Sequence, residues 1–201
     1  MKNRILSSIQ KEVLVGVLLG DGHLEKRGNS YRIKFQQSNF HKDYIMHLYE
    51  IFKNLTKSEP KSKIIKSFGK EQISWYFNTI SHLDFKYYGE LFYKEKKKII
   101  PNNLDSLLTP RGLAYWFMDD GGLKSHQSKG VIIHTDNFTL SEIESICGLF
   151  EKKWGLSSWP RKQIDGSQIY ISGKSYEKLR ELIYPFLIED MYYKFPSERK
   201  R

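Results

Sequence analysis

The chain has 201 residues, enough for one domain or two small ones with a hydrophobic core. It carries 33 Lys and Arg residues against 23 Asp and Glu residues, a net charge of +10. That surplus serves solubility, but on a small chain it also creates a field that attracts polyanions, so a nucleic-acid partner is favoured. An aromatic content of 14% argues against a disordered basic tail.

The sequence also bears on where the protein works. The longest apolar run, residues 13–19, is too short to span a bilayer, and the N-terminus lacks the apolar core and cleavage site of a signal peptide. Cys147 is the only cysteine, so no intramolecular disulfide can form. We expect no membrane partner and a soluble intracellular protein. Abundant Lys, Ile, Asn, Tyr and Phe, as AT-rich genes encode, favour a mitochondrial or chloroplast origin.

Hydrophobic periodicity predicts the elements of the first half. Apolar residues recur at helical spacing in three segments, and alternation of apolar and polar residues marks a half-buried strand. Within that strand Tyr31, Ile33 and Phe35 are expected to face the core. In chain order the prediction is a helix over 9–20, a strand over 31–36, a helix over 40–55, a hairpin over 61–78 that turns at Gly69, and a helix over 82–93.

The second half predicts a similar succession. Thr139 and Glu142 have the spacing of a capping box, in which each side chain binds the backbone N–H of the other residue at a helix start. In chain order the prediction is a helix over 113–119, a strand over 130–135, a helix over 139–154, a hairpin over 159–172 that turns near Asp165 and Gly166, and a helix over 175–187.

The two halves repeat one another. The segments VGVLLGDGHL (15–24) and AYWFMDDGGL (114–123) both end an apolar run near Asp-Gly, and QQSNF (36–40) matches HTDNF (134–138) at nearly the same offset. Such self-similarity over about 100 residues indicates a tandem duplication. We therefore predict an α+β fold made of two related α-β-β-α-β-β-α subdomains. The predicted subdomains are residues 1–103 and 104–201.

The predicted strands leave one face of each antiparallel sheet without covering helices. A polar residue on such a face is usually plain surface, but these faces are rich in Arg, Lys and Gln, which neutralise phosphates and read base edges. A two-stranded ribbon also fits the major groove, so we expect both faces to bind double-stranded DNA. The candidate contacts are Arg27, Arg32, Lys34, Gln36, Lys63, Lys66, Lys70 and Gln72 in the first half and Lys124, His126, His134, Arg161, Gln163 and Gln168 in the second.

Each half places one aspartate at the end of an apolar helix, where the negative end of the helix dipole disfavours it. Asp21 and Asp120 have a simple interpretation as parts of solvated helix stops. However, they recur in register, and helices that are apolar nearly all round favour burial against each other. Two carboxylates brought together require a cation, and oxygen ligands suit Mg²⁺. A metal ion held by these acids would lie between two basic sheet faces that bind DNA. This arrangement predicts phosphodiester hydrolysis by two-metal chemistry.

A lysine shortly precedes a proline late in each half. Lys98 belongs to a run of charged residues, 94–98, that has a simple interpretation as surface. Its match to Lys194 across the repeat singles it out from that run. A lysine near a phosphoryl centre stabilises developing negative charge or orients the attacking water. Both lysines are therefore candidate catalytic residues.

The motifs LVGVLLGDG (14–22) and LAYWFMDDG (113–121) resemble the two signature sequences of LAGLIDADG homing endonucleases. Their order and spacing are similar to those of the single-chain, two-motif members that mobile introns encode, which act as monomers. One such motif is a weak signal, but two of them about 100 residues apart, each followed by strand patterns, are a strong one. The resemblance covers nearly the whole chain.

The resemblance implies a fold, a cofactor and a reaction. Two saddle-shaped sheets are expected to lie over DNA, with two or three Mg²⁺ ions that Mn²⁺ can replace. It implies that Asp21 and Asp120 are metal-binding catalytic acids, while Gly20 and Asp119 offer backbone carbonyls to the metal. Cleavage of both strands of a long, asymmetric site, leaving short 3′ overhangs, is the reaction that the family performs.

The helix ends depart from a symmetric pattern. The small residues Gly16 and Gly20 allow the first helix to approach its partner closely, but Tyr115 and Asp119 hold the matching places in the second. The helix pair should therefore be asymmetric, and the two metal sites need not be equivalent.

The strands that follow the motifs differ as well. Gly130 and Ile132 stand where the first half has Arg32 and Lys34, so the second half should grip its half-site differently. We therefore expect an asymmetric target. A monomer is expected because one chain already holds both halves.

Two other kinds of function stay open. The first is a binding protein of the same fold, either an intron maturase that binds its own intron RNA or a catalytically silent DNA- or RNA-binding protein. The second is a basic structural nucleic-acid protein without catalysis. The repeat-matched aspartates Asp21 and Asp120 favour cleavage, because neither alternative requires a pair of acids at buried helix ends.

Overall fold

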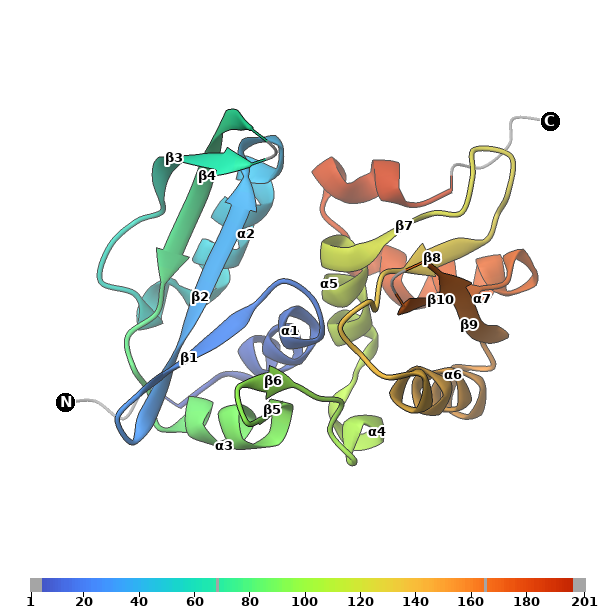
Figure 1. Cartoon of the computed structure of the whole chain (residues 1–201), viewed down its shortest axis with the longest axis horizontal. Coiled ribbons are helices and arrows are strands. Elements are labelled where there is room, and N and C mark those ends of the chain that lie inside the picture. Colours follow the sequence, from blue (N-terminus) through green and yellow to red (C-terminus); the bar gives the residue numbers. More distant parts are fainter. Residues whose placement is uncertain (1–4, 68, 165, 197–201) are drawn as a thin grey trace.

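The computed structural model describes residues 5–67, 69–164 and 166–196, which form two halves that lie side by side (Figure 1). Each half combines a four-stranded antiparallel sheet with helices, so the predicted α+β class and the tandem repeat are confirmed. The first half contains α1 (Ser8–Leu19), β1 (His23–Arg27), β2 (Ser30–Ser38), α2 (Lys42–Phe52), β3 (Lys61–Ser67), β4 (Lys70–Asn78), α3 (Asp84–Phe92), β5 (Tyr93–Lys94) and β6 (Lys97–Lys98). The second contains α4 (Leu104–Leu107), α5 (Pro110–Asp120), β7 (Gly121–Leu123), β8 (Val131–Ile133), α6 (Leu140–Trp154), β9 (Ser158–Gln163), β10 (Gly166–Ile171) and α7 (Tyr176–Ile183).

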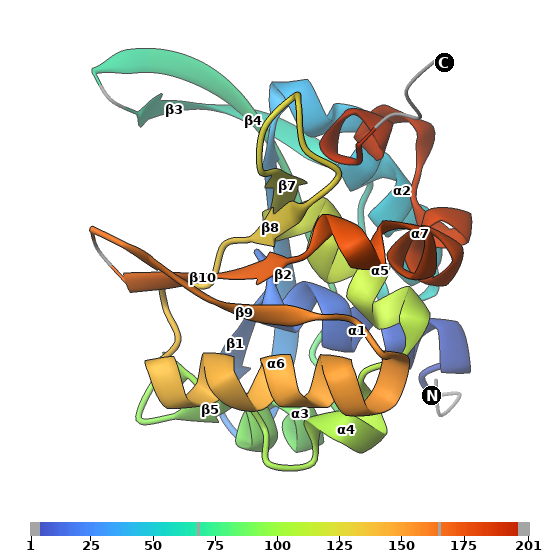
Figure 2. The same cartoon turned by 90° about the vertical axis from the view of Figure 1, so that its right-hand side faces the viewer.

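The two large sheets have the same strand order. It is β1-β2-β4-β3 in the first half and β7-β8-β10-β9 in the second, and every neighbouring pair is antiparallel. Figure 2 shows the β3–β4 and β9–β10 hairpins projecting to the same side of the molecule, opposite α7. One ligand on that side can therefore meet both sheets.

α1 and α5 pack against each other at the junction of the two halves. Each begins at a side-chain cap: Ser7 forms a capping box with Gln10, and the Thr109 hydroxyl accepts from the backbone N–H of Gly112, just before Pro110. Most of their residues are fully buried, which explains why both sequences are apolar nearly all round. No helix among the described residues is long and apolar enough to cross a membrane.

The two central helices approach closely because glycines meet where they pack. A Cβ atom at Gly16 would lie 2.2 Å from the carbonyl oxygen of Gly112 and 2.9 Å from Tyr115 Cβ. A Cβ atom at Gly20 would lie 2.5 Å from Asp119 Cβ. The helix pair is therefore asymmetric, because Gly16 faces Tyr115 as well as Gly112, and Gly20, at the end of α1, faces Asp119.

Two predicted segments have a different structure, and the short helix α4 was not among the predicted elements. The chain forms the β5–β6 ribbon over residues 93–98, where a helix end and a charged run were expected. Glu95 and Lys96 reverse the chain there with positive φ angles of 51° and 69°. The last predicted helix ends early, at Ile183, because Pro185 has no N–H for a helical hydrogen bond.

Replacing Gly16 by Ala is expected to lower the free energy of unfolding by about 1–3 kcal/mol, because the added methyl group meets a backbone oxygen that cannot rotate away. The matched control is Gly148→Ala in α6, where nothing lies within 4 Å of the added carbon. Removing a helical glycine there should raise stability by about 0.5–1 kcal/mol. Urea unfolding followed by circular dichroism measures both, and equal effects would contradict the close helix contact.

Candidate active site and nucleic-acid interface

The C-terminal ends of α1 and α5 bring the two predicted acids to one place. Asp21 follows Gly20, the residue that ends α1, and Asp120 is the last residue of α5. Together with Lys98 and His134, both aspartates line a cavity of about 110 Å³. The close packing of the helices causes this arrangement, because it holds the two helix ends side by side. The site therefore joins one carboxylate from each repeat.

Each candidate lysine binds the motif of its own half. Lys98 Nζ donates to the backbone carbonyl of Gly20, and Lys194 Nζ donates to the carbonyls of Met118 and Asp119, the latter at 2.7 Å. Burial lowers the pKa of both lysines, while the nearby aspartates act in the opposite direction. Their positive charges lie at the C-terminal ends of α1 and α5, where they offset the negative ends of the helix dipoles.

The side chain of Asp119, in the second motif, contacts the backbone of the first motif. Its Oδ2 accepts from the backbone N–H of Asp21 at 3.1 Å, in space left free by the missing side chain of Gly20. Burial raises the pKa of Asp119 well above its usual range, and the charges of Asp21 and Asp120 add to the rise. Its Oδ1 is buried near the Tyr44 hydroxyl, with no well-formed hydrogen bond to any described residue. The side chain thus bridges the two helix ends.

The two catalytic candidates have different surroundings. Asp21 is exposed and accepts a hydrogen bond from Gln37 Nε2 at 2.8 Å. Asp120 is partly buried, and this burial, together with the charge of Asp21, raises its pKa to about 7, although Lys98 acts in the opposite direction. The predicted inequivalence of the two halves is therefore present in the hydrogen bonds and burial of their carboxylates.

The atoms at the site suit a hard divalent cation. The carboxylates of Asp21 and Asp120 are oxygen ligands, which Mg²⁺ prefers. The carbonyls of Gly20 and Asp119 are oxygen atoms too, but each already accepts a hydrogen bond from Lys98 or Lys194. Burial and, after it, the charge of Asp21 raise the pKa of Asp120, and a bound cation would favour the charged form of this carboxylate. In residues 5–67, 69–164 and 166–196, no group of three or more His, Cys, Asp or Glu residues forms a metal-binding cluster. Mg²⁺ usually keeps several waters and takes phosphate oxygens from a substrate, so few protein ligands suffice.

A hydrogen-bond chain leads from Asp21 into the other half. Gln37 Nε2 binds Asp21, Gln37 Oε1 lies 3.3 Å from His41 Nδ1, and His41 Nε2 lies 2.9 Å from the hydroxyl of Tyr193. Tyr193 immediately precedes Lys194, which binds the second motif. The chain therefore couples the first aspartate to the segment that carries the second lysine.

Sequence reasoning left Gln37 out of the site. Alternation along β2 assigns Gln36 to the DNA-facing side and Gln37 to the core side, so only Gln36 became a candidate. The signal that could have found Gln37 is its place in the repeated segment QQSNF, close in sequence to the first motif. The matching residue of the second half, Thr135, instead donates its hydroxyl to the carbonyl of Ser167 at 2.6 Å.

Cross-strand pairing fixes which side chains share the uncovered face of the first sheet. Phe35 pairs with Phe77 on the core face, and alternate residues point the other way. Lys66 pairs with Glu71 on the face opposite Lys63, so its predicted place beside Lys63 is wrong, because residues three apart in a strand point to opposite faces. The candidates on the uncovered face are Arg27, Arg32, Lys34, Gln36, Lys63, Lys70 and Gln72.

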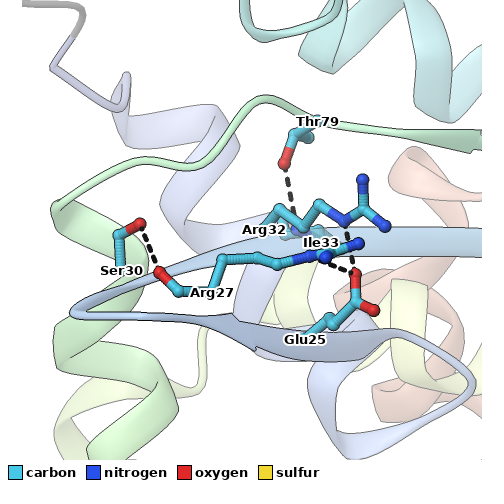
Figure 3. Close-up of polar contacts among 6 residues, drawn as sticks. All are labelled: Glu25, Arg27, Ser30, Arg32, Ile33 and Thr79. Atoms are coloured by element: carbon cyan, nitrogen blue, oxygen red, sulfur yellow. Dashed lines mark hydrogen bonds and ion pairs between the residues drawn. The ribbon is translucent and has the colours of Figure 1, made fainter.

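Glu25 lies between two of the candidate arginines on that face (Figure 3). It pairs directly with Arg32 across β1 and β2, and its Oε2 accepts from Nε of Arg32 and, at 3.2 Å, from Nε of Arg27. The hydrogen bond from Arg32 holds the pKa of Glu25 below its usual range. The two arginines are therefore ordered in advance, but one of their charges is already balanced within the protein.

The second sheet has a less charged face. Alternation places His134, Arg161, Gln163 and Gln168 on it, with Lys124 directly after β7 and His126 in the loop that follows. Gln168 is only 7% exposed, and its Nε2 lies 2.7 Å from His134 Nδ1. One group of the Gln168 amide is therefore engaged inside the protein, and its contact with DNA stays a prediction.

The paired aspartates, matched lysines and duplicated sheets agree with one known family. A model of the LAGLIDADG DNA endonuclease family matches residues 11–179. The chain belongs to this family. A probable intron-encoded endonuclease 1 from Wickerhamomyces canadensis is 34% identical, over 94% of this chain and 84% of the relative. The cytochrome b mRNA maturase bI2 from Debaryomyces hansenii is 32% identical, over 96% of this chain and 75% of the relative.

Solved structures extend the similarity of this LAGLIDADG chain from sequence to fold. The homing endonuclease I-WcaI bound to its DNA recognition sequence is 34% identical and matches with a TM-score of 0.89, over 94% of this chain and 86% of that chain. I-DmoI in complex with DNA and Mn is 18% identical and matches with a TM-score of 0.52, over 89% and 97%. The second match supports the fold alone, whereas the first shares sequence and fold.

Because Gln37 positions Asp21 in this LAGLIDADG site, Gln37→Ala is expected to lower kcat for DNA cleavage about 10- to 100-fold without weakening DNA binding. Gln36→Ala is the matched control, since this neighbouring side chain lies on the uncovered face and should affect binding more than chemistry. Single-turnover cleavage and binding without metal separate the two effects. Unchanged cleavage with weaker binding in Gln37→Ala would contradict the positioning role.

Lys34→Ala is expected to weaken DNA binding and to flatten its salt dependence by about 0.9 in the slope of log K against log salt, because the variant neutralises one phosphate fewer. Arg32→Ala should flatten the slope less, because Glu25 already balances the guanidinium charge. In a Glu25→Gln background, Arg32→Ala should have the full effect. An unchanged slope in Lys34→Ala would place this face away from the DNA.

Proposed function

We propose that the chain is a homing endonuclease that cuts both strands of DNA at a specific site. The observation that carries this proposal is the cavity that Asp21 and Asp120 share where the ends of α1 and α5 meet, at the junction of the two sheet-bearing halves. In this arrangement the sheets hold a duplex on either side of the centre, and the paired acids lie where the strands are cut. The relative named a probable intron-encoded endonuclease supports the proposal.

Divalent metal ions belong to the proposed site. The carboxylates of Asp21 and Asp120 would hold them, together with the second lone pairs of the Gly20 and Asp119 carbonyls, whose first lone pairs accept from Lys98 and Lys194. We propose Mg²⁺ as the physiological ion, two or three ions per site, and Mn²⁺ as a substitute. When bound, the ions supply an activated water and stabilise the leaving oxygen. The Mn in the complex of I-DmoI with DNA, a protein of this fold, supports the choice.

The side chains of the protein prepare the site for the reaction. Gln37 orients the Asp21 carboxylate, while Asp119 fixes the backbone at the same residue. Lys98 and Lys194 place positive charge beside the two motifs, where it stabilises the negative charge that develops on a phosphate during hydrolysis. The two halves use different side chains around their acids, so the two strands need not be cut at equal rates.

The proposed substrate is a long and asymmetric duplex, cut with short 3′ overhangs. The uncovered faces of the two sheets carry different residues, so each of the subdomains 1–103 and 104–201 would bind a different half-site. A monomer suffices, because both halves are in one chain. Relatives named as intron-encoded support a gene within a mobile intron, for which we propose a mitochondrial or chloroplast origin.

A plasmid carrying the uninterrupted insertion junction of the gene's own intron is expected to be cut in Mg²⁺ and to stay intact in EDTA. Asp21→Asn and Asp120→Asn should each lower the cleavage rate by a factor on the order of 10² to 10³, because a neutral amide is a poor metal ligand and leaves the reacting charge unbalanced. Binding measured in EDTA should persist in both variants. Undiminished cleavage by either variant would contradict the proposal that this site is the nuclease active site.

A second candidate function is help in RNA splicing. It is favoured by the relative from Debaryomyces hansenii, which is named a cytochrome b mRNA maturase. In that function the chain binds its own intron RNA and the aspartates are dispensable. Splicing of the intron RNA with and without protein tests it. Stimulation that survives Asp21→Asn and Asp120→Asn supports a maturase, whereas binding without cleavage or stimulation points to a catalytically silent DNA- or RNA-binding protein.

A further inference from the structure

One transverse row of the second sheet presents aliphatic and aromatic side chains on the uncovered face. Gly122 pairs with Ile132, Ile132 with Tyr170, and Tyr170 with Trp159, so the row crosses all four strands. With neighbouring strands about 4.8 Å apart, the row is about 14 Å wide. Trp159 is 47% exposed. These four residues are called the Trp159 row.

The matching row of the first sheet is polar. Ile132 stands in the place of Lys34 in the repeat, and Lys34 pairs with His23 on one side and Asn78 on the other. The same position in the two sheets thus presents an ammonium, an imidazole and an amide in one half and apolar surface in the other. Core packing does not explain the difference, because Trp159 is open to solvent.

The aromatic part of the Trp159 row is held in place by its neighbours. The rings of Trp159 and Tyr170 meet edge to face, with centroids 4.8 Å apart, and Lys124 Nζ lies 5.4 Å from the Tyr170 centroid. The Tyr170 ring lies so close to Gly130 that a Cβ there would come within 2.6 Å of its hydroxyl. Arg32 holds the place of Gly130 in the first half, so the missing side chain is what admits the ring.

The Trp159 row begins beside the catalytic centre. Gly122 is two residues beyond Asp120, and one step along the same face lie Gln168 and His134, which lines the catalytic cavity. Residues two apart on one face of a strand are about 7 Å apart. A duplex seated on the catalytic centre therefore passes over the row within a few base pairs. Arg161, on the same face, provides charge that complements the phosphates.

We propose that the Trp159 row recognises thymine methyl groups in the major groove of one half-site. The C5 methyl of thymine is the apolar feature of that groove, and apolar side chains recognise it by direct contact. The surface is ordered before binding, so meeting the base edges costs little conformational entropy. This inference rests on the proposed binding of DNA by the sheets and adds the chemistry by which the second half selects its bases.

Binding to a target selected from a randomised duplex library, in EDTA so that the DNA stays intact, tests the inference. The selected sites should contain thymine at one or more positions of a single half-site. Replacing thymine by deoxyuridine at those positions removes only the methyl group and should weaken binding about fourfold per methyl. The same replacement in the other half-site should have no effect.

Two substitutions within the row should abolish this discrimination. Trp159→Ala removes the exposed ring, and Ile132→Lys installs the residue of the first sheet, so both variants should bind thymine and deoxyuridine targets equally. Lys34→Ala, the matched control in the first sheet, should bind more weakly yet keep the fourfold difference. Thermal unfolding checks that Trp159→Ala is folded. Ile132→Lys tests the thymine preference a second time, through a different residue of the row.

The outcomes separate this inference from the proposed function. Failure of the wild-type protein to bind any duplex would overturn both. Sequence-specific binding without thymine preference in either half-site would overturn the inference alone. A methyl effect that persists in both Trp159→Ala and Ile132→Lys would do the same, because the methyl group would then be recognised elsewhere.

Discussion

The contact between Gly16 and the carbonyl of Gly112 is the constraint on which the rest of the site depends. Backbone approach this close is open only to glycine, and it brings the two helix ends together although the halves are separate α+β units. Asp21 and Asp120 meet because of it. The helix packing thus imposes repulsion between the two carboxylates. The positive charges of Lys98 and Lys194, which are held at the two motifs by hydrogen bonds, oppose this repulsion.

The two halves share the same backbone arrangement, but their side chains make different contacts. The lysines make equivalent bonds in the two halves, but Gln37 has no equivalent amide at Thr135, and Asp119 fills the space that Gly20 leaves. On the sheets the same divergence changes the chemistry that is offered to a ligand. A symmetric backbone with asymmetric side chains suits a target whose two halves differ in sequence.

The repeat made much of the site predictable, because two copies in register are a long-range constraint that a single chain records directly. It predicted that Asp21 and Asp120 lie together and that Lys98 and Lys194 match one another, and the structure places each lysine on the motif of its own half. What it could not give depends on cross-strand register and side-chain reach. Lys66 was assigned to the wrong face, Gln168 is engaged by His134, and Gln37 reaches Asp21 from a position that alternation assigns to the core. The β5–β6 ribbon has strands too short to show a pattern.

The bond of each lysine to its own motif has a consequence for recombination between relatives. The first half contains both Lys98 and the Gly20 carbonyl that it binds. A first half joined to the second half of a relative therefore keeps this lysine contact. The bridges that cross the junction are not portable in this way: Asp119 requires Gly20, and Tyr193 requires His41. Halves with different DNA specificities can therefore be exchanged between relatives only if the residues on both sides of these two contacts remain compatible, at the ends of α1 and α5 and between Tyr193 and His41.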